Sequence, residues 1–123
     1  MMSKQTLEQK RAEHAWKKAE EGLHNHDKDY VNDAKGLPAL IMNSGLMQVM
    51  AYLHGKGGRH ETIAEHLRDW LHEQCKTPTK FDAFMQYLMN AGSREFQAIT
   101  TEAFAWLKWL RQMASARNGP SGL

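Results

Sequence analysis

The sequence predicts an all-α fold, a compact single-domain bundle of five or six helices. Three observations predict it: apolar residues recur at helical spacing along most of the chain, no stretch alternates apolar and polar residues as a strand would, and Gly-, Pro- or Asn-containing turns separate the periodic segments. With 123 residues, the chain has the length of one domain and can bury one hydrophobic core. We therefore expect residues 1–123 to form one domain, with disordered tails at 1–5 and 118–123.

The segment expected to organise the core covers residues 36–53 and has no charged residue after Gly36. If helical, it is apolar on every side, which is typical of a buried helix. Pro38 suits a first helical turn, where its missing N–H needs no partner, and it disfavours helix in the residue before it. We expect a break near Leu37 and then one helix over residues 38–55, within which Gly45 would let another helix approach closely. Internal polar residues and the short length argue against a membrane span.

Before this segment, a first helix is expected over residues 6–23. Thr6 and Gln9 have the spacing of a capping box, and small apolar residues then recur every three to four positions. Gly22 and the histidine-rich run after it should end the helix, and one or two further turns are expected over residues 30–35. The polar face of the first helix carries Lys10, Arg11, His14, Lys17, Lys18, Glu20 and Glu21.

Three more helices are expected, over residues 60–73, 80–91 and 94–117. Each carries apolar side chains at helical spacing, in i, i+3, i+4 and i+7 order over residues 80–91, and the Pro78 and Gly92 regions separate them. The helix over residues 60–73 should turn the following residues toward water: Glu61, Glu65, Arg68, Asp69 and Glu73.

Composition narrows the class of protein. A net charge of +2 is too small to predict nucleic-acid binding without a local basic patch. The single cysteine, Cys75, excludes an internal disulfide framework and a multi-cysteine zinc site. The first 14 residues lack the apolar region of a secretory signal. We expect a soluble, cytoplasmic protein with no membrane contact.

No pattern predicts a catalytic or metal site. His60 and His66 are six residues apart, which turns them to different faces of a helix, whereas zinc-protease histidines lie four apart. His24, His26, Asp27 and Asp29 could meet a metal on a loop, but nothing fixes them. Lys76 could lower the pKa of the neighbouring Cys75 thiol, yet no positioned base accompanies it. We expect surface histidines, no metal, no cofactor, no catalytic residue and therefore no enzyme.

A resemblance to a known family comes from residues in three parts of the chain. They are Arg11-Ala12; Tyr30, Leu37-Pro38-x-x-Ile41 and Gly45-Leu46-x-Gln48-x-x-Ala51-Tyr52-Leu53; and Thr101-Glu102-Ala103-Phe104, Lys108-Trp109-Leu110-Arg111 and Ala114. In this order and spacing, over residues 8–116, the chain resembles the small all-helical subunit of the type III-B CRISPR effector, the Cmr complex.

The resemblance implies a non-catalytic role in antiviral defence. Small subunits of this family stack in a few copies as a minor filament along the guide RNA and target RNA, and contact the backbone and largest subunits, while cleavage belongs to those other subunits. Arg11, Lys108 and Arg111 match basic positions of the family and are expected RNA contacts. The helical charge pattern adds Lys17, Lys18 and Lys35, and Trp109 is the expected partner contact. Two alternatives stay open: a stand-alone helical nucleic-acid-binding regulator, and a small enzyme whose site forms only in three dimensions.

Overall fold

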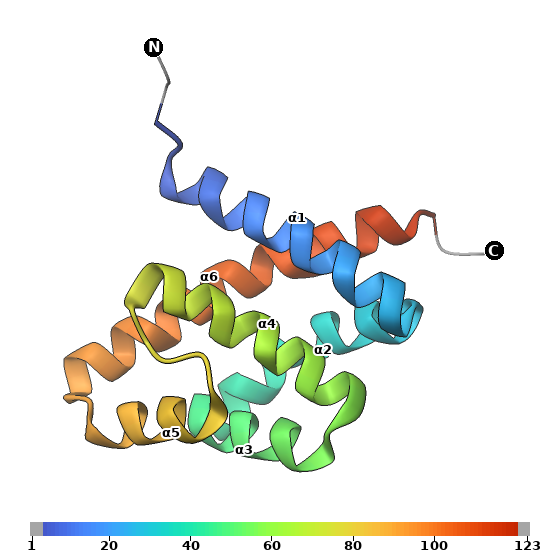
Figure 1. Cartoon of the computed structure of the whole chain (residues 1–123). Helices are drawn as coiled ribbons and strands as arrows, with labels where there is room; N and C mark the ends of the chain where they lie inside the picture. The colour runs from blue at the N-terminus through green and yellow to red at the C-terminus, as the bar shows by residue number, and fades with distance from the viewer. Residues whose placement is uncertain (1–3, 121–123) are drawn as a thin grey trace.

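The computed structural model describes residues 4–120, and within them the chain forms six α-helices and no strand (Figure 1). The predicted all-α, single-domain bundle is confirmed. The helices are α1 (Leu7–His26), α2 (Lys28–Ser44), α3 (Leu46–Lys56), α4 (Gly58–Cys75), α5 (Phe81–Asn90) and α6 (Ser93–Asn118).

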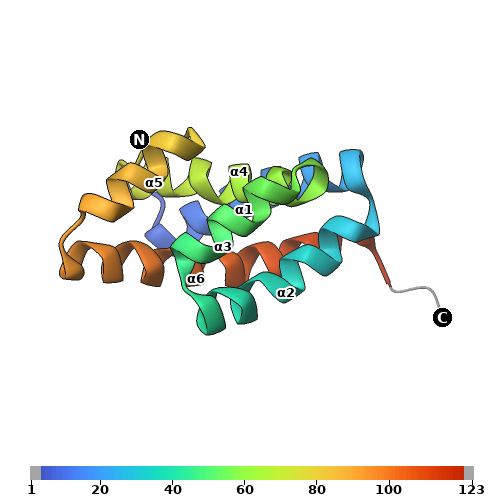
Figure 2. The ribbon, with the colours of Figure 1, turned by 90° about the horizontal axis from the view of Figure 1, so that it is seen from below.

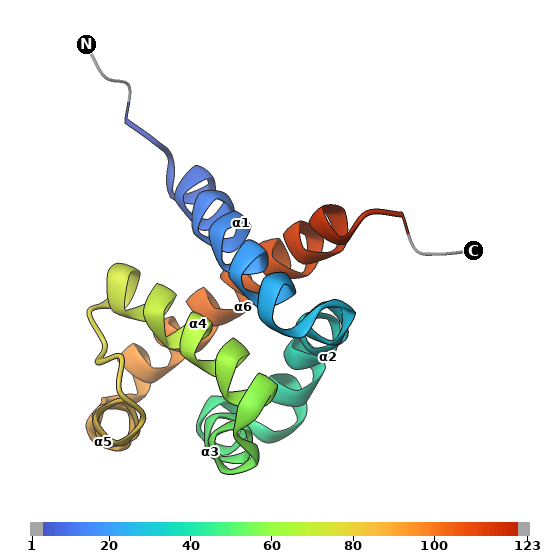
Figure 3. The ribbon, with the colours of Figure 1, turned by 45° about the vertical axis from the view of Figure 1, so that its right-hand side comes forward.

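The last helix, α6, is the central element of the bundle. It is the longest helix and packs against α1, α2 and α4. It crosses α1 near the middle of both helices, as Figure 3 shows, while α2 runs alongside it in Figure 2. α3 packs against α4 and α5 at the end of the molecule away from this crossing.

The core lies between these helices and is built from large side chains at helical spacing. Trp106, Tyr30 and Phe84 are among the largest fully buried side chains. Of the inner stripe that periodicity predicts for α6, Ile99, Ala103, Leu107 and Leu110 are buried, while Phe96 and Met113 are partly buried. Trp106, predicted to flank the stripe, is fully buried. Burial of this much apolar surface is the main favourable term in folding.

The segment expected to form one core helix forms parts of two. α2 continues unbroken through Leu37 and Pro38 to Ser44, so the predicted break near Leu37 is wrong. The chain turns instead at Gly45, whose φ of +86° and ψ of 157° are open to glycine almost alone. No other helix approaches Gly45, since a Cβ placed there would meet nothing within 4 Å. The turn at Gly45 thus divides the segment between α2 and α3, and one side of each of these helices is exposed to solvent.

These exposed sides correct the expectation of burial on every face. Leu40, Met42 and Tyr52 are 43%, 77% and 52% exposed, respectively. The buried side is supplied by Leu37 and Ile41 on α2, and by Leu46, Val49 and Met50 on α3. Each of the two helices therefore has one buried stripe, as an ordinary surface helix does.

The close approach of two helices that was expected at Gly45 occurs instead at Gly22. α1 does not end near Gly22; it runs to His26, and the chain turns at Asp27 with a φ of 55°. Gly22 is buried where the ring of Tyr30 lies against its backbone, and an added Cβ would lie much closer to the carbons of that ring than van der Waals contact allows. The missing side chain therefore lets α1 and α2 approach closely.

Two smaller predictions have different outcomes. The capping box is confirmed, because Thr6 Oγ1 accepts from the Gln9 N–H at 3.1 Å and Gln9 Oε1 accepts from the Thr6 N–H at 2.8 Å. Arg68, expected to face water, is 2% exposed and donates from Nη2 to Glu61 Oε2 at 2.5 Å and from Nε to the Thr79 carbonyl at 2.8 Å.

The predicted tails lie largely outside the described residues, at 1–3 and 121–123. Within the described part, Asn118 is the last residue of α6, and Gln5 Nε2 donates to Glu13 Oε1 at 3.3 Å. No helix in residues 4–120 combines the length and apolarity that crossing a membrane requires.

Candidate nucleic-acid interface

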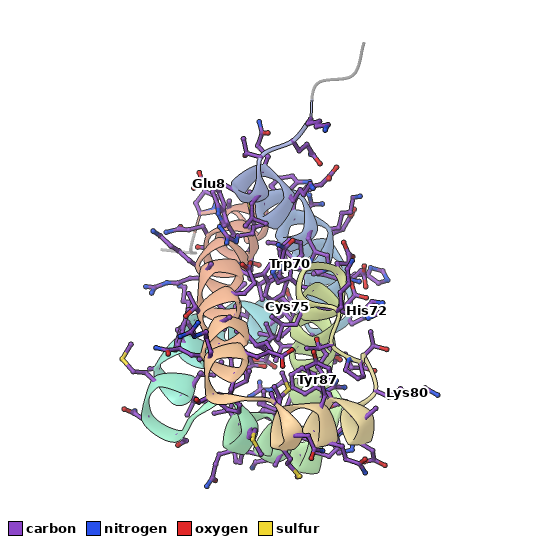
Figure 4. All side chains as sticks on the ribbon, turned by 90° about the vertical axis from the view of Figure 1, so that its left-hand side faces the viewer. Glu8, Trp70, His72, Cys75, Lys80 and Tyr87 are labelled. Carbon is purple, nitrogen blue, oxygen red and sulfur yellow. The ribbon has the colours of Figure 1, made fainter. Side chains whose placement is uncertain are left out.

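Arg11, one of the expected RNA contacts, is half-buried and bound by Glu102. Its Nε and Nη2 donate to the two carboxylate oxygens of Glu102 at 2.7 and 2.8 Å, which joins α1 to α6. The Trp70 indole N–H adds a third hydrogen bond to Glu102 at 3.0 Å, and Figure 4 shows Trp70 between α4 and α6. The hydrogen bond to Glu102 raises the pKa of Arg11. This bidentate pair leaves little of the Arg11 charge for a phosphate.

The two lysines expected on the same helix are also offset by acidic neighbours. Lys18 Nζ lies 3.3 Å from Glu21 and 3.7 Å from Asp69, and 20% of its side chain is exposed. Lys17 is more exposed, at 68%, with Glu13 Oε2 3.9 Å from its Nζ. Ion pairs this exposed are weak, so Lys17 can still turn toward an anion.

The other three expected contacts differ from the α1 cations. Lys35 on α2, and Lys108 and Arg111 on α6, are exposed, and none forms an ion pair with a carboxylate within residues 4–120. Lys108 and Arg111 are three positions apart and so share one face of α6. We name Lys35, Lys108 and Arg111 the open cation set. The structure thus divides the six predicted residues into three offset cations and three open ones.

The neighbouring acids explain why this set is open. α6 has two acidic residues, of which Glu102 binds Arg11 and Glu95 accepts a hydrogen bond from the Tyr87 hydroxyl. From residue 103 to its end, α6 has none. On α2, Asp29 and Asp33 both face Arg59 of α4, at 3.2 and 3.5 Å. From residue 103 onward, the outer side of α6 therefore carries net positive charge, whereas the two lysines and two aspartates of α2 balance each other and leave Lys35 as an exposed cation, unpaired among the described residues.

Trp109, the expected partner contact, is half-buried and packs against the core. Its neighbour Trp106 is fully buried. Other large apolar residues are more exposed than Trp109, with Met42 at 77% and Met89 at 63%. Trp109 is thus in part a core residue, and its role at an interface stays a prediction.

A groove between α1 and α4 holds a site that the sequence did not predict. His14, expected on the polar face, is 8% exposed and lies between the rings of Trp70 and Trp106, with centroids 5.1 and 5.4 Å away. Its Nε2 faces Asp69 Oδ2 at 2.7 Å and Glu73 Oε2 at 3.6 Å. Burial raises the pKa of Asp69, but the His14 hydrogen bond and the Lys18 charge outweigh it and lower the pKa overall. No spacing rule links position 14 to positions 69 and 73, so the sequence had no signal for this cluster.

His66 is the second histidine wrongly expected at the surface. It is 7% exposed, and its Nδ1 lies 2.7 Å from the Tyr30 hydroxyl. Burial lowers the pKa of His66 to about 3, with the Lys18 charge adding to the effect. Burial also raises the pKa of Tyr30, so the hydroxyl keeps its proton and donates to His66. His66 is therefore a neutral core residue that joins α4 to α2.

The other residues considered for chemistry lie apart. His26 Nε2 lies 2.9 Å from Thr62 Oγ1, and Asp29 pairs with Arg59, so the histidine-rich run of α1 forms no cluster with its aspartates. The pKa of the Cys75 thiol is raised, first by burial and then by Glu102 and Glu95, which is opposite to the lowering that Lys76 could have caused. A raised thiol pKa disfavours the nucleophilic thiolate.

Comparisons with known proteins were made against families, curated proteins and solved structures. A family model described as "CRISPR-associated protein (Cas_Cmr5)" matches residues 7–117. Among solved structures, the chain is similar to the X-ray crystal structure of a CRISPR-associated Cmr5 family protein from Thermus thermophilus. That match has a TM-score of 0.76 and 23% sequence identity, and covers 92% of this chain and 97% of the other. No match was found among curated proteins.

Proposed function

The chain belongs to the Cmr5 family of CRISPR-associated proteins, which are small subunits of the type III-B Cmr complex, and from this premise we propose how it acts there. It is a non-catalytic subunit in the cytoplasm that contacts the paired guide RNA and target RNA in antiviral defence. Copies of the chain stack on one another and on the backbone and largest subunits. Its RNA contacts are made by the open cation set: Lys35, Lys108 and Arg111.

One observation supports the RNA proposal: within the described residues Lys35, Lys108 and Arg111 form no ion pair, whereas the cations expected on α1, which are Arg11, Lys17 and Lys18, each have a carboxylate within 4 Å. A cation whose charge is already neutralised gains little from a phosphate, while an exposed, unpaired cation releases condensed counterions when it binds one. Arg11 therefore acts mainly within the fold, and Lys17 and Lys18 contribute at the margin. Base pairing reads the sequence in guided effectors, so backbone contacts of this kind suffice, as in the Cas9-type effector for which the rule is stated.

The test compares two triple variants of equal charge change, each assembled with the other Cmr subunits. The first reverses the open cation set: Lys35→Glu, Lys108→Glu and Arg111→Glu. The control reverses three exposed cations elsewhere on the chain: Lys10→Glu, Lys56→Glu and Lys80→Glu. The affinity of each complex for a labelled guide–target RNA duplex is measured over a range of salt concentrations.

We expect the first variant to bind RNA about tenfold or more weakly and to lower the slope of log affinity against log salt by about 2, since each lost phosphate contact removes roughly 0.7–0.9. The control should lie close to the natural chain. Equal losses in both variants would mean that net charge alone acts, and unchanged binding in the first variant would exclude the open cation set.

Assembly is tested separately, because RNA affinity and subunit contact can fail independently. Trp109→Gln should reduce the amount of this chain that is retained with the tagged complex. Since Trp109 also packs on the core, Met42→Gln and Met89→Gln serve as controls at more exposed positions. Normal retention of a folded Trp109→Gln chain would remove Trp109 from the interface.

A further inference from the structure

The groove between α1 and α4 brings three metal-ligating side chains to one point. His14 reaches it from α1, and Asp69 and Glu73, four positions apart, reach it from one face of α4. One ligand atom from each lies within 4.8 Å of the other two. We propose that His14, Asp69 and Glu73 form a binding site for a divalent transition metal of the zinc class, a function beyond RNA contact and independent of it.

The distances are close to those that such a metal requires. Zinc binds histidine nitrogen at about 2.0–2.1 Å and carboxylate oxygen at about 2.0–2.2 Å, so two ligand atoms of a tetrahedral site lie about 3.3–3.5 Å apart. His14 Nε2 lies 2.7 Å from Asp69 Oδ2 and 3.6 Å from Glu73 Oε2. Small rotations of the two carboxylates, which are 40% and 56% exposed, would bring both onto a metal.

The histidine is held in place while the carboxylates remain adjustable. The imidazole lies between the Trp70 and Trp106 rings and is 8% exposed, so its Nε2 has one direction in which to point. Its Nδ1 is buried without a hydrogen-bond partner, while its Nε2 donates to the Asp69 carboxylate, which can only accept. A divalent cation would take the place of the Nε2 proton and bind both carboxylates, whereas that proton is within hydrogen-bond distance of only one of them, Asp69.

The donor set selects the class of ion. Imidazole nitrogen favours zinc, nickel and similar ions, whereas magnesium and calcium prefer all-oxygen sites. The groove opens to water, which can supply a fourth ligand, as it does beside three protein ligands in other open zinc sites. Lys18 Nζ lies 3.7 Å from Asp69 and 3.3 Å from Glu21. If Asp69 binds the metal, Lys18 therefore still has Glu21 as an acidic partner.

Such a site would join the first helix to the fourth. Metal bound to the folded chain alone stabilises it by mass action, because the unfolded chain separates the three ligands. His14 and Asp69 already link α1 to α4 through one hydrogen bond, and a metal would add Glu73 to that link.

The experiment measures Zn²⁺ binding to the tag-free, full-length chain by calorimetry, with Co²⁺ absorption as a spectroscopic probe of the ligand geometry. Glu73→Gln is the main variant, because Glu73 is half exposed and its loss leaves the His14–Asp69 hydrogen bond intact. Glu65→Gln, exposed and two turns earlier on α4, is the matched control. His14→Gln is a second variant, whose folding is checked by circular dichroism.

We expect one Zn²⁺ per chain, a Co²⁺ spectrum of a four-coordinate site, and binding at least tenfold weaker in Glu73→Gln but unchanged in Glu65→Gln. Zn²⁺ should raise the melting temperature of the natural chain and not that of Glu73→Gln. The proposal is overturned if the natural chain takes up no Zn²⁺ at millimolar concentration. Equal binding by natural chain and Glu73→Gln would also overturn it, by placing the metal on surface histidines.

Discussion

Replacing Gly22 by alanine tests the close approach of α1 and α2. In an exposed helix the change would be favourable, because alanine is about 1 kcal/mol better than glycine in a helix interior. Here the new Cβ would overlap the ring of Tyr30, which is 0% exposed and has its hydroxyl bound to His66. Overpacking of this kind costs about 1–3 kcal/mol, and a well-anchored ring gives a value at the upper end. We expect Gly22→Ala to lower the free energy of unfolding by about 1–3 kcal/mol.

Gly36→Ala is the matched control. Gly36 lies within α2, is exposed, and has no atom within 4 Å of the position of an added Cβ. Its replacement should stabilise the chain by about 0.5–1 kcal/mol, chiefly by restricting the unfolded state. The two identical substitutions should therefore have opposite signs.

The assay is urea-induced unfolding followed by circular dichroism at a helical wavelength. With a urea m-value of about 1–3 kcal/mol/M, a change of 1 kcal/mol in the free energy of unfolding moves the midpoint by roughly 0.3–1 M, so both changes are measurable. In a Tyr30→Leu background the cost of Gly22→Ala should shrink, because contacting residues are not additive. A Gly22→Ala chain as stable as Gly36→Ala would refute the packing of the Tyr30 ring against α1.

Three further predictions concern the polar contacts and the backbone. A double-mutant cycle of Arg11→Met and Glu102→Gln should give a coupling energy of about 1.5–3 kcal/mol, because the pair is bidentate, charge-assisted and only partly exposed. A coupling energy below about 0.5 kcal/mol would mean that Arg11 behaves as a free surface cation. Because burial lowers the His66 pKa to about 3, the unfolded chain binds a proton below about pH 6.5 that the folded chain does not. The contribution of His66 to the free energy of unfolding is therefore fully present above pH 6.5 and declines by up to about 1.4 kcal/mol per pH unit toward pH 3. His66→Gln should make the urea midpoint depend less on pH when it is measured between pH 7 and 5. Asp27→Gly should raise the melting temperature, because Asp27 holds φ 55° and ψ −143°, a conformation that costs a non-glycine residue about 1–3 kcal/mol.

Helical periodicity was a sufficient guide to the fold. The inner stripe of α6 and the Thr6–Gln9 capping box are local patterns, and local patterns survive into the structure whenever tertiary packing agrees with them. The family could also be inferred, and a family model that matches residues 7–117 confirms it over the part of the chain that carried the resemblance. Burial of single polar residues could not be predicted, because His14, His66 and Arg68 lie beside charged residues in sequence and find their partners on other segments.

Gly22 and Gly45 likewise separate what a local sequence pattern can predict from what only tertiary packing decides. The sequence correctly marks Gly22 and Gly45 as unusual positions within helical segments, but it gives each the other's role. Whether a glycine serves a turn or a close contact depends on what lies opposite it, and Tyr30 reaches Gly22 only after α2 has folded back against α1.

The six expected RNA contacts were likewise chosen by charge and helix face, which the sequence contains. Which of those charges remain open depends on long-range pairs such as Arg11 with Glu102, 91 residues apart. The sequence by itself determined an all-helical member of the Cmr5 family with basic helix faces, because periodicity, composition and motif order are properties of neighbours along the chain. Only the tertiary structure decided that Lys35, Lys108 and Arg111, rather than Arg11, Lys17 and Lys18, are left without an ion pair within the described residues, because an ion pair forms between residues that folding, and not sequence, brings together.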